Sequence, residues 1–245
     1  SDRGFRRNFM INILFSGNGK VFDGVLTCIL SILKRTKTIE PFCIYVYTMD
    51  VTRIKPEYTP ISGEMIEFLD GVAKEYNAKN QILRVDVTDL YEQYFAKCPN
   101  EDAYCSPYTL LRLFADLVPG MPDKLLYLDV DILFQHDIEM LYNINVTDYE
   151  YAAARDHYGK YLINPNYINA GVLLLNLAKI KETGLLVKAR KLIQTKKLMF
   201  ADQSAISRST TKKKMLPQCA IHGMRCFVTS HRCSWSCAVM RYMTN

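Results

Sequence analysis

The first ninety residues alternate between short apolar runs and longer stretches in which apolar residues recur with helical spacing. The apolar runs cover residues 10–15, 42–47 and 81–87, and their aromatic and β-branched content is typical of strands. The stretches between them, residues 22–34 and 62–77, carry an apolar residue every three or four positions, which predicts amphipathic helices. This β-α-β-α-β order favours an α/β fold with a mostly parallel central sheet flanked by helices.

The same pattern continues along the chain and fades after Pro217. The further expected elements are a helix at 106–118, a strand within 124–134, a helical turn at 138–141, strands at 151–154 and 172–177, a basic helix at 185–195 and a helix that begins at 201. We therefore predict a basic N-terminal extension (1–9), one folded domain (10–217) and an irregular C-terminal segment (218–245).

Two carboxylates one residue apart, Asp129 and Asp131, follow the apolar run Leu125 to Leu128. Residues i and i+2 of an extended segment point to the same side, so both carboxylates can face one cation while Val130 is anchored in the core. Carboxylate oxygens suit Mg²⁺ or Mn²⁺, and such sites leave ligand positions for water and phosphate. The alternative is a solvated turn, and the buried strand that precedes the pair favours the metal site.

Other polar residues lie beside predicted strands, where open α/β sheets place their ligands. Asp156 follows the strand at 151–154, and Asn169 precedes Gly171 and the strand at 172–177. Glycine permits a close backbone approach next to Asn169. These positions are candidates for one common site.

Arg112 and Asp202 each have a structural alternative to a role in binding. Arg112 stands four residues before Asp116, which favours an ion pair on the surface of a helix over a clamp for phosphate or carboxylate. Asp202 stands at the start of a predicted helix, where it can serve as an N-cap. Both alternatives remain open from the residues alone.

The 245 residues are 49% hydrophobic and 23% charged, as is usual for a globular protein. No apolar window is long enough for a membrane span, and the short run after the N-terminal arginines is not a convincing signal peptide, so we expect a cytoplasmic protein. The net charge of +6 is concentrated between Lys179 and Arg225, where twelve Lys or Arg stand against two acidic residues. An anionic ligand, an anionic lipid surface or a solvated helix face fits this stretch. Nucleic acid is not expected, because interleaved aromatic residues and a recognisable binding fold are missing.

Three motifs in one order resemble glycosyltransferase family 8: Leu126-Tyr127-Leu128-Asp129-Val130-Asp131, then Asn169-Ala170-Gly171, then Asp202-Gln203-Ser204-Ala205. The resemblance covers about residues 10–217. It implies a GT-A fold, a retaining mechanism and a UDP-sugar donor such as UDP-glucose or UDP-galactose. It further implies Mn²⁺, or Mg²⁺, as cofactor and a saccharide or lipid-linked glycan as acceptor. Peripheral association at the inner face of the membrane, through the basic stretch, is compatible with this function.

The resemblance also implies roles for single residues. Asp129 and Asp131 match the family's metal-binding carboxylates, with His231 as the third ligand and His222 as the second candidate for that place. Asp156, Asp202 and Gln203 match residues around the transferred sugar, which makes them the catalytic candidates. The positions implied to bind the donor are Phe15, Ser16, Asn18, Lys20, Arg112, Asp129, Val130, Asp131, Asn169 and Ala170.

Two departures from the family pattern support an alternative function. Val21 stands where an aromatic residue is frequent, and the Gly and the Lys-Pro-Trp expected after the late histidine are missing, with Ser234 at the place of the Gly. A degenerate lid over the diphosphate would leave a UDP-sugar-binding protein with impaired catalysis.

Overall fold

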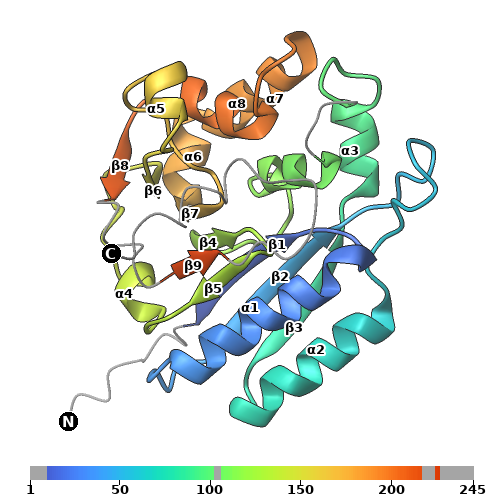
Figure 1. Ribbon diagram of the computed structural model, residues 1–245, viewed down its shortest axis with the longest axis vertical. Coiled ribbons are helices and arrows are strands. Elements are labelled where there is room, and N and C mark those ends of the chain that lie inside the picture. Colours follow the sequence, from blue (N-terminus) through green and yellow to red (C-terminus); the bar gives the residue numbers. More distant parts are fainter. Residues whose placement is uncertain (1–9, 102–105, 217–223, 227–245) are drawn as a thin grey trace.

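The computed structural model describes residues 10–101, 106–216 and 224–226. At its centre lies a seven-stranded sheet in the order β3-β2-β1-β4-β7-β6-β8 (Figure 1). The strands are β1 (Ile11–Ser16), β2 (Phe42–Thr48), β3 (Gln81–Asp86), β4 (Lys124–Leu128), β6 (Tyr151–Ala154), β7 (Val172–Asn176) and β8 (Lys213–Leu216). Only β7 runs against its two neighbours, and the other four pairs are parallel, which confirms the α/β fold with a mostly parallel sheet.

Helices cover both faces of the sheet (Figure 1). One face packs against α1 (Phe22–Arg35), α2 (Gly63–Tyr76) and α4 (Glu139–Tyr142). The elements against the other face are α3 (Thr88–Phe95), the 3₁₀ helix η2 (Pro107–Phe114), α6 (Leu177–Thr183), α7 (Leu185–Thr195) and α8 (Ala201–Ser209). Two further short helices are η1 (Gly19–Val21) and α5 (Gly159–Leu162).

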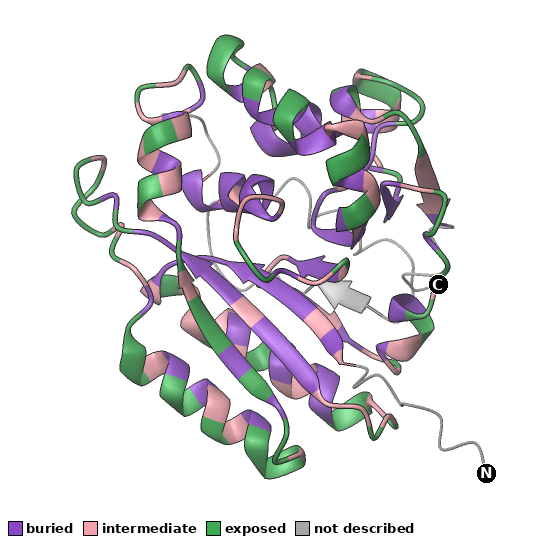
Figure 2. Ribbon diagram, turned by 180° about the vertical axis from the view of Figure 1, so that it is seen from behind, coloured by how far each residue is buried: buried purple, intermediate pink, exposed green. Residues whose placement is uncertain are grey.

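The central strands are buried on both faces because successive side chains enter two different cores. In β4, Leu125 and Tyr127 pack with α3, η2, α7 and α8, whereas Leu126 and Leu128 pack with α1 and α2. Figure 2 shows the central strands largely buried and the edge strand β3 largely exposed. A strand covered on both sides reads as a continuous apolar run, and here it fixes the direction of the residues that follow it.

The observed elements agree with most of the predicted ones, with specific differences. The predicted helix at 106–118 is a shorter 3₁₀ helix, and α3, α5, α6 and β8 were not predicted. A two-stranded ribbon pairs β5 (Ile132–Phe134) with β9 (Met224–Cys226). Of these two strands, β9 lies in the C-terminal segment that was predicted to be irregular. The predicted boundaries at 9 and 217 are not tested. Over the described ranges, no helix is long and apolar enough to cross a membrane.

Candidate active site

A cavity of about 290 Å³ lies at the edge of the sheet where the parallel strands β1 and β4 end. Its walls come from the turn after β1, η2, the turn after β4, the segment between β6 and β7, and the start of α8. The lining residues are Ser16, Gly17, Asn18, Val21, Ser106, Tyr108, Thr109, Arg112, Tyr127, Asp129, Val130, Asp131, Asp156, Tyr158, Leu162, Ala170, Gly171, Phe200, Asp202 and Gln203. The three motifs of the sequence, far apart along the chain, therefore meet in one cavity.

The reversed direction of β7 brings the second motif to the first. Because β7 is antiparallel to β4 and β6, the residues just before it lie beside the residues just after those two strands. The Asp129 amide donates to the Gly171 carbonyl at 2.8 Å, and the Asn169 amide donates to the Ala154 carbonyl at 2.9 Å. These backbone contacts fix the segment 169–171 against the carboxylates.

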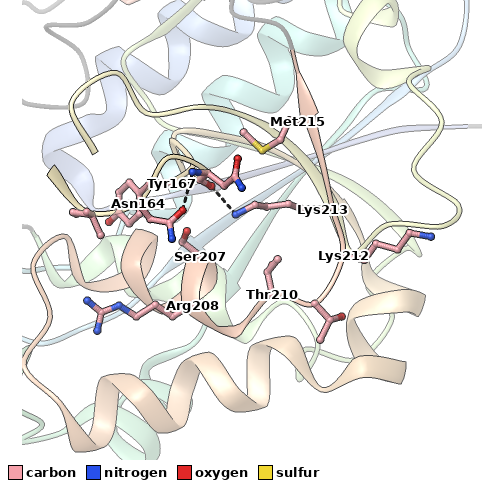
Figure 3. Close-up of a pocket in the computed structure, with 11 residues that line it drawn as sticks. Asn164, Tyr167, Ser207, Arg208, Thr210, Lys212, Lys213 and Met215 are labelled. Carbon is pink, nitrogen blue, oxygen red and sulfur yellow. Dashed lines mark hydrogen bonds between the residues drawn. The ribbon is translucent and has the colours of Figure 1, made fainter. Parts of the chain in front are cut away.

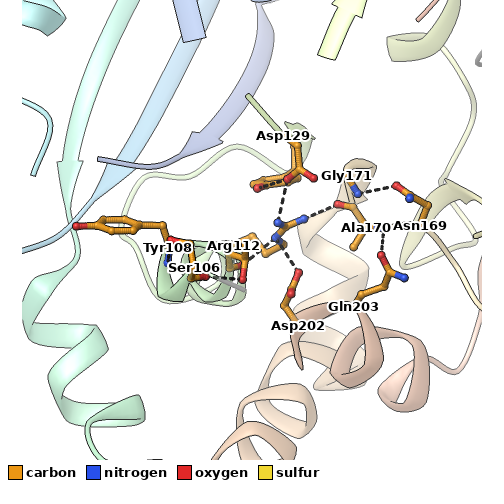
Figure 4. A network of polar contacts seen from close by, with 11 residues as sticks. Ser106, Tyr108, Arg112, Asp129, Asn169, Ala170, Gly171, Asp202 and Gln203 are labelled. Atoms are coloured by element: carbon orange, nitrogen blue, oxygen red, sulfur yellow. Dashed lines mark hydrogen bonds and ion pairs between the residues drawn. The ribbon is translucent and has the colours of Figure 1, made fainter. Parts of the chain in front are cut away.

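Arg112 is the centre of a polar network in this cavity (Figure 4). Its side chain is only 3% exposed. Nη2 donates to Asp129 Oδ1 at 3.0 Å, and Nε lies 3.2 Å from Asp202 Oδ2. Nη1 donates to the Ala170 carbonyl, and the guanidinium carbon lies 3.8 Å from the centre of the Tyr127 ring. One buried cation thus links the first, second and third motifs.

Burial and pairing act in opposite directions on the charges of this network. Burial by itself lowers the pKa of Arg112, but interactions with Tyr127, Asp202 and Asp129 outweigh it and raise the pKa above its usual value. Burial raises the pKa of Asp202, and Asp129 adds to this effect while Arg112 opposes it. Among the neighbouring groups, Arg112 therefore opposes the rise in the pKa of Asp202 most strongly.

The two carboxylates after β4 fit a hard divalent cation. The Tyr127 hydroxyl donates to Asp129 Oδ1 at 2.8 Å, the same oxygen that the guanidinium holds. The other oxygen, Oδ2, points toward Gly171, where a Cβ atom would lie 2.8 Å away, so only glycine leaves it this room. Asp131 lines the same cavity. Within the described residues no three His, Cys, Asp or Glu side chains form a metal site, and His231 lies outside them.

A second polar cluster surrounds Asp156. Its Oδ1 accepts from the Gly159 amide at 2.6 Å, and its Oδ2 accepts from Asn169 Nδ2 at 3.3 Å and from Gln203 Nε2 at 3.4 Å. Gln203 Oε1 in turn accepts from the Ala170 amide at 3.1 Å. Asp156 and Gln203 line the cavity, whereas Asn169 supports them from outside it.

Only some of the predicted donor-binding residues at the end of β1 and in the turn that follows line the cavity. Ser16 and Asn18 line the cavity, and the buried Ser16 hydroxyl has no hydrogen-bond partner among the described residues. Asn18 Oδ1 accepts from the Lys20 amide, and its Nδ2 donates to the Glu57 carbonyl. The Phe15 ring is buried in the core, and the Lys20 ammonium is exposed and lies 3.8 Å from the Glu57 carboxylate. Binding roles for Phe15 and Lys20 remain predictions.

Both structural alternatives from the sequence are wrong. Arg112 does not pair with Asp116, because that carboxylate accepts from Arg190 of α7 at 3.0 Å. Asp202 is not the N-cap of α8, because Phe200 holds that position and Asp202 lies in the first turn. Both side chains instead point into the cavity. There they pair with each other, and burial protects this ion pair from screening by solvent.

Several residues that line the cavity were not predicted from the sequence. Tyr127 contributes its ring to Arg112 and its hydroxyl to Asp129, and its position two residues before Asp129 in an extended segment was a usable signal. Tyr158 and Leu162 form an exposed part of the cavity wall, and no local pattern pointed to them.

The fold and this site define a domain of the GT-A type, with the three motifs gathered at the end of a central strand. The crystal structure of the galactosyltransferase LgtC, in complex with donor and acceptor sugar analogs, is similar with a TM-score of 0.63 and 20% sequence identity. The match covers 84% of this chain and 73% of that one. At this identity the likeness shows the fold.

The chain belongs to glycosyltransferase family 8, whose profile, "Glycosyl transferase family 8", matches residues 12–208. A Haemophilus influenzae protein named "Putative glycosyltransferase" is 31% identical over 189 residues, which cover 73% of this chain and 52% of that protein. The glycosyltransferase GlyA of Streptococcus pneumoniae is 30% identical over 202 residues, 80% of this chain and 25% of that protein. The chain thus spans about half and about a quarter of the length of these two relatives. The family, one of retaining nucleotide-sugar transferases, is the one that the motifs predicted.

Proposed function

We propose that the chain transfers a hexose, glucose or galactose, from a UDP-sugar to a saccharide or lipid-linked glycan, with retention of configuration and dependence on Mn²⁺ or Mg²⁺. The observation that carries this proposal is the position of Arg112, which contacts Asp129 through Nη2 and Asp202 through Nε. It joins the carboxylates suited to the diphosphate end of a donor to the residues suited to the sugar end.

The charge of the cavity supports a metal-dependent reaction. Among the described residues, its lining carries one cation, Arg112, against four carboxylates, Asp129, Asp131, Asp156 and Asp202. A diphosphate entering such a cavity would be repelled unless a cation accompanied it. Asp129 and Asp131 would hold that cation, which would stabilise the charge that develops on the leaving diphosphate.

The sugar end of the cavity offers fixed hydrogen-bonding groups. Asp156 is held by Gly159 and Asn169, so its carboxylate is fixed before a ligand binds. Asp202 and Gln203 come from the first turn of α8 and face the same space. Carboxylates here can orient sugar hydroxyls and stabilise positive charge on the anomeric carbon. Gln203 is a poor nucleophile, so we favour attack by the acceptor on the face that the diphosphate leaves, with the diphosphate taking the acceptor's proton.

The proposal also includes the route of the acceptor to the cavity and the attachment of the protein to a membrane. The exposed Tyr158 and Leu162 at the wall of the cavity give an acceptor a route to the donor. The basic stretch Lys179 to Arg225 supports an anionic acceptor or peripheral attachment at the inner membrane face, where lipid-linked glycans are found.

Donor hydrolysis and transfer test this function directly. UDP release from UDP-glucose and UDP-galactose is measured with and without Mn²⁺ for the wild type, for Asp131→Ala and for the control Asp148→Ala, which removes an exposed carboxylate outside the cavity. We expect Asp131→Ala to lose about 10²–10³ in rate, because a metal ligand is lost, and Asp148→Ala to retain the wild-type rate.

Two results would change the conclusion. Equal turnover by wild type and Asp131→Ala would refute a metal site at this pair. Tight UDP binding without hydrolysis or transfer, over a panel of donors and acceptors, would select the alternative of a UDP-sugar-binding protein.

A further inference from the structure

A second, larger cavity of about 730 Å³ lies beside the first, in a groove between α8, β8 and the segment that links β6 to β7 (Figure 3). Its lining residues are Ile163, Asn164, Asn166, Tyr167, Ser207, Arg208, Thr210, Thr211, Lys212, Lys213 and Met215. The groove therefore combines cations with neutral hydrogen-bonding groups, and none of the described residues that line it is acidic.

Two of the cations serve the groove directly. Lys213 extends from β8 toward the segment 164–167, where its ammonium donates to the Asn166 carbonyl at 2.7 Å (Figure 3). Burial lowers the pKa of Lys213. Arg208 projects from the last turn of α8 and forms no ion pair with any described carboxylate. Lys212 points to the other side of the strand, over the Tyr149 ring.

Acidic residues that could neutralise this groove are few. The buried Glu150 carboxylate is already engaged, because it accepts hydrogen bonds from the Thr211 and Lys212 amides and from the Thr211 hydroxyl. The chain contains no Asp or Glu after Asp202. Its cations beyond that point are Arg208, Lys212, Lys213, Lys214, Arg225, Arg232 and Arg241.

The groove shares two structural elements with the 290 Å³ cavity, called the donor cavity from here on because of its proposed function. Helix α8 places Asp202 and Gln203 in the donor cavity and Ser207 and Arg208 in the groove. Five residues of helix separate Gln203 from Arg208, a rise of about 8 Å. The segment between β6 and β7 likewise contributes Asp156, Tyr158 and Leu162 to the cavity and its later residues to the groove. The two cavities therefore open on neighbouring parts of the same two elements.

We propose that this groove binds an anionic group of the acceptor, a phosphate or carboxylate carried by a saccharide, while the sugar to be extended lies at the donor cavity. This inference rests on the proposed transferase function. Lys213, inside the groove, contacts the anion, and Arg208 adds positive charge at the end of α8. Asn164 and Ser207 offer partners for sugar hydroxyls. An extended glycan fits the groove better than a flat lipid surface does, because the Lys213 ammonium is held inside it by the Asn166 carbonyl.

The test uses the full chain saturated with UDP and Mg²⁺, so that the donor cavity is filled. Glucose 6-phosphate, glucose, inorganic phosphate and phosphatidylglycerol-containing vesicles are added in turn, and NMR shifts of the amides of Asn164, Asn166 and Lys213 are followed. We expect glucose 6-phosphate to shift these amides and to bind more tightly than either glucose or phosphate alone.

Matched variants separate a local site from general charge. The double variant R208Q/K213Q should weaken glucose 6-phosphate binding at least tenfold, because one charge-assisted contact and a second nearby positive charge are lost. The control K34Q/K79Q removes the same charge from exposed positions near α1 and α2, far from the groove, and should change the affinity less than twofold. Arg208→Glu, at an exposed helical position, repeats the test if the double variant unfolds.

Several outcomes would overturn the proposal. Normal UDP binding without any amide shift by glucose 6-phosphate would refute the groove and leave the transferase function standing. Failure of UDP to bind would refute the transferase function instead. Equal affinity for inorganic phosphate and glucose 6-phosphate, or shifts by anionic vesicles alone, would refute a saccharide as the occupant. Equal loss of affinity in K34Q/K79Q would refute a specific site.

Discussion

Replacing Arg112 by Met should expose how far the cavity depends on one buried cation. Methionine keeps much of the length and apolar volume of the side chain but removes the charge and all donors. Asp202, with 8% of its side chain exposed, and Asp129, with 27%, then lose their common partner. The Ala170 carbonyl loses its donor as well.

The cost follows from the burial of these groups. Breaking a buried ion pair by removing one partner typically destabilises a protein by about 3–5 kcal/mol, because the remaining charge stays uncompensated. The more buried Asp202 should account for most of it, since solvent screens the half-exposed Asp129. Arg112→Lys keeps the charge but not the planar fork, so we expect a smaller loss of about 1–3 kcal/mol.

The loss should depend on pH in a defined direction. Arg112 opposes the effect of burial on the pKa of Asp202, so its removal raises this pKa further in the folded state. A carboxyl group whose pKa is higher in the folded than in the unfolded state loses stability as the pH rises from the unfolded value of about 3.9 toward the folded one. The difference between wild type and variant should therefore be larger at pH 8 than at pH 5.

Urea unfolding followed by circular dichroism at both pH values measures this difference. The double variant R112M/D202N provides the control, because neutral Asn removes the uncompensated charge and should recover about 1–3 kcal/mol. A loss that is the same at both pH values, together with no recovery in the double variant, would refute the assignment of Asp202 as the charge that Arg112 compensates.

Three further variants test other parts of the site. Tyr127→Phe keeps the ring under Arg112 but loses the 2.8 Å hydrogen bond to Asp129, so Mg²⁺-dependent UDP binding should weaken several-fold with about 1 kcal/mol less stability; calorimetry showing unchanged metal dependence would contradict this. Gly159→Ala would place a Cβ atom 2.1 Å from the Tyr167 ring and should cost about 1–3 kcal/mol in urea unfolding, and wild-type stability would argue against this packing. Burial raises the pKa of Tyr167 to about 12, so the free energy of unfolding should fall by on the order of 2–3 kcal/mol between pH 10 and 12, because Tyr167 ionises first in the unfolded state. In Tyr167→Phe the free energy of unfolding should fall less steeply over this range. An equal fall in wild type and variant would exclude this group as the cause.

Local patterns predicted the elements whose own residues show a clear apolar period. The strands β1, β2 and β6 and the helices α1, α2 and α7 begin and end within a few residues of the predicted positions. The helix α6 was missed because β7 leads into it without a break, and only the Asn176 side chain, which accepts from the Lys179 amide, marks its start. Sequence periodicity does not reveal strand direction, so the reversal of β7 came only from the structure.

The parts of the site that depend on local chain geometry could be predicted from the sequence. The parts that depend on contacts between distant segments could not. The i, i+2 rule placed Asp129 and Asp131 on one side of the chain, and both line the cavity. Arg112, by contrast, was assigned to Asp116 by helical spacing, because its true partners stand 17 and 90 residues away in sequence. Only the family resemblance pointed to it, since burial of an arginine depends on elements that meet late in the fold.

The two cavities on either side of α8 differ in the sign of the charge on their lining residues, and this difference would orient an acceptor. In the part of the chain that the structure describes, an anionic group that enters the donor cavity meets four carboxylates and one arginine, whereas the groove offers Arg208 and Lys213 without an acidic lining residue. Attraction at one end and repulsion at the other would direct the anionic end of a glycan into the groove and its neutral end toward the donor. Under the proposed function, loss of Arg208 should therefore raise the KM for an anionic acceptor with little change in kcat, and this effect should shrink as added salt screens the exposed guanidinium.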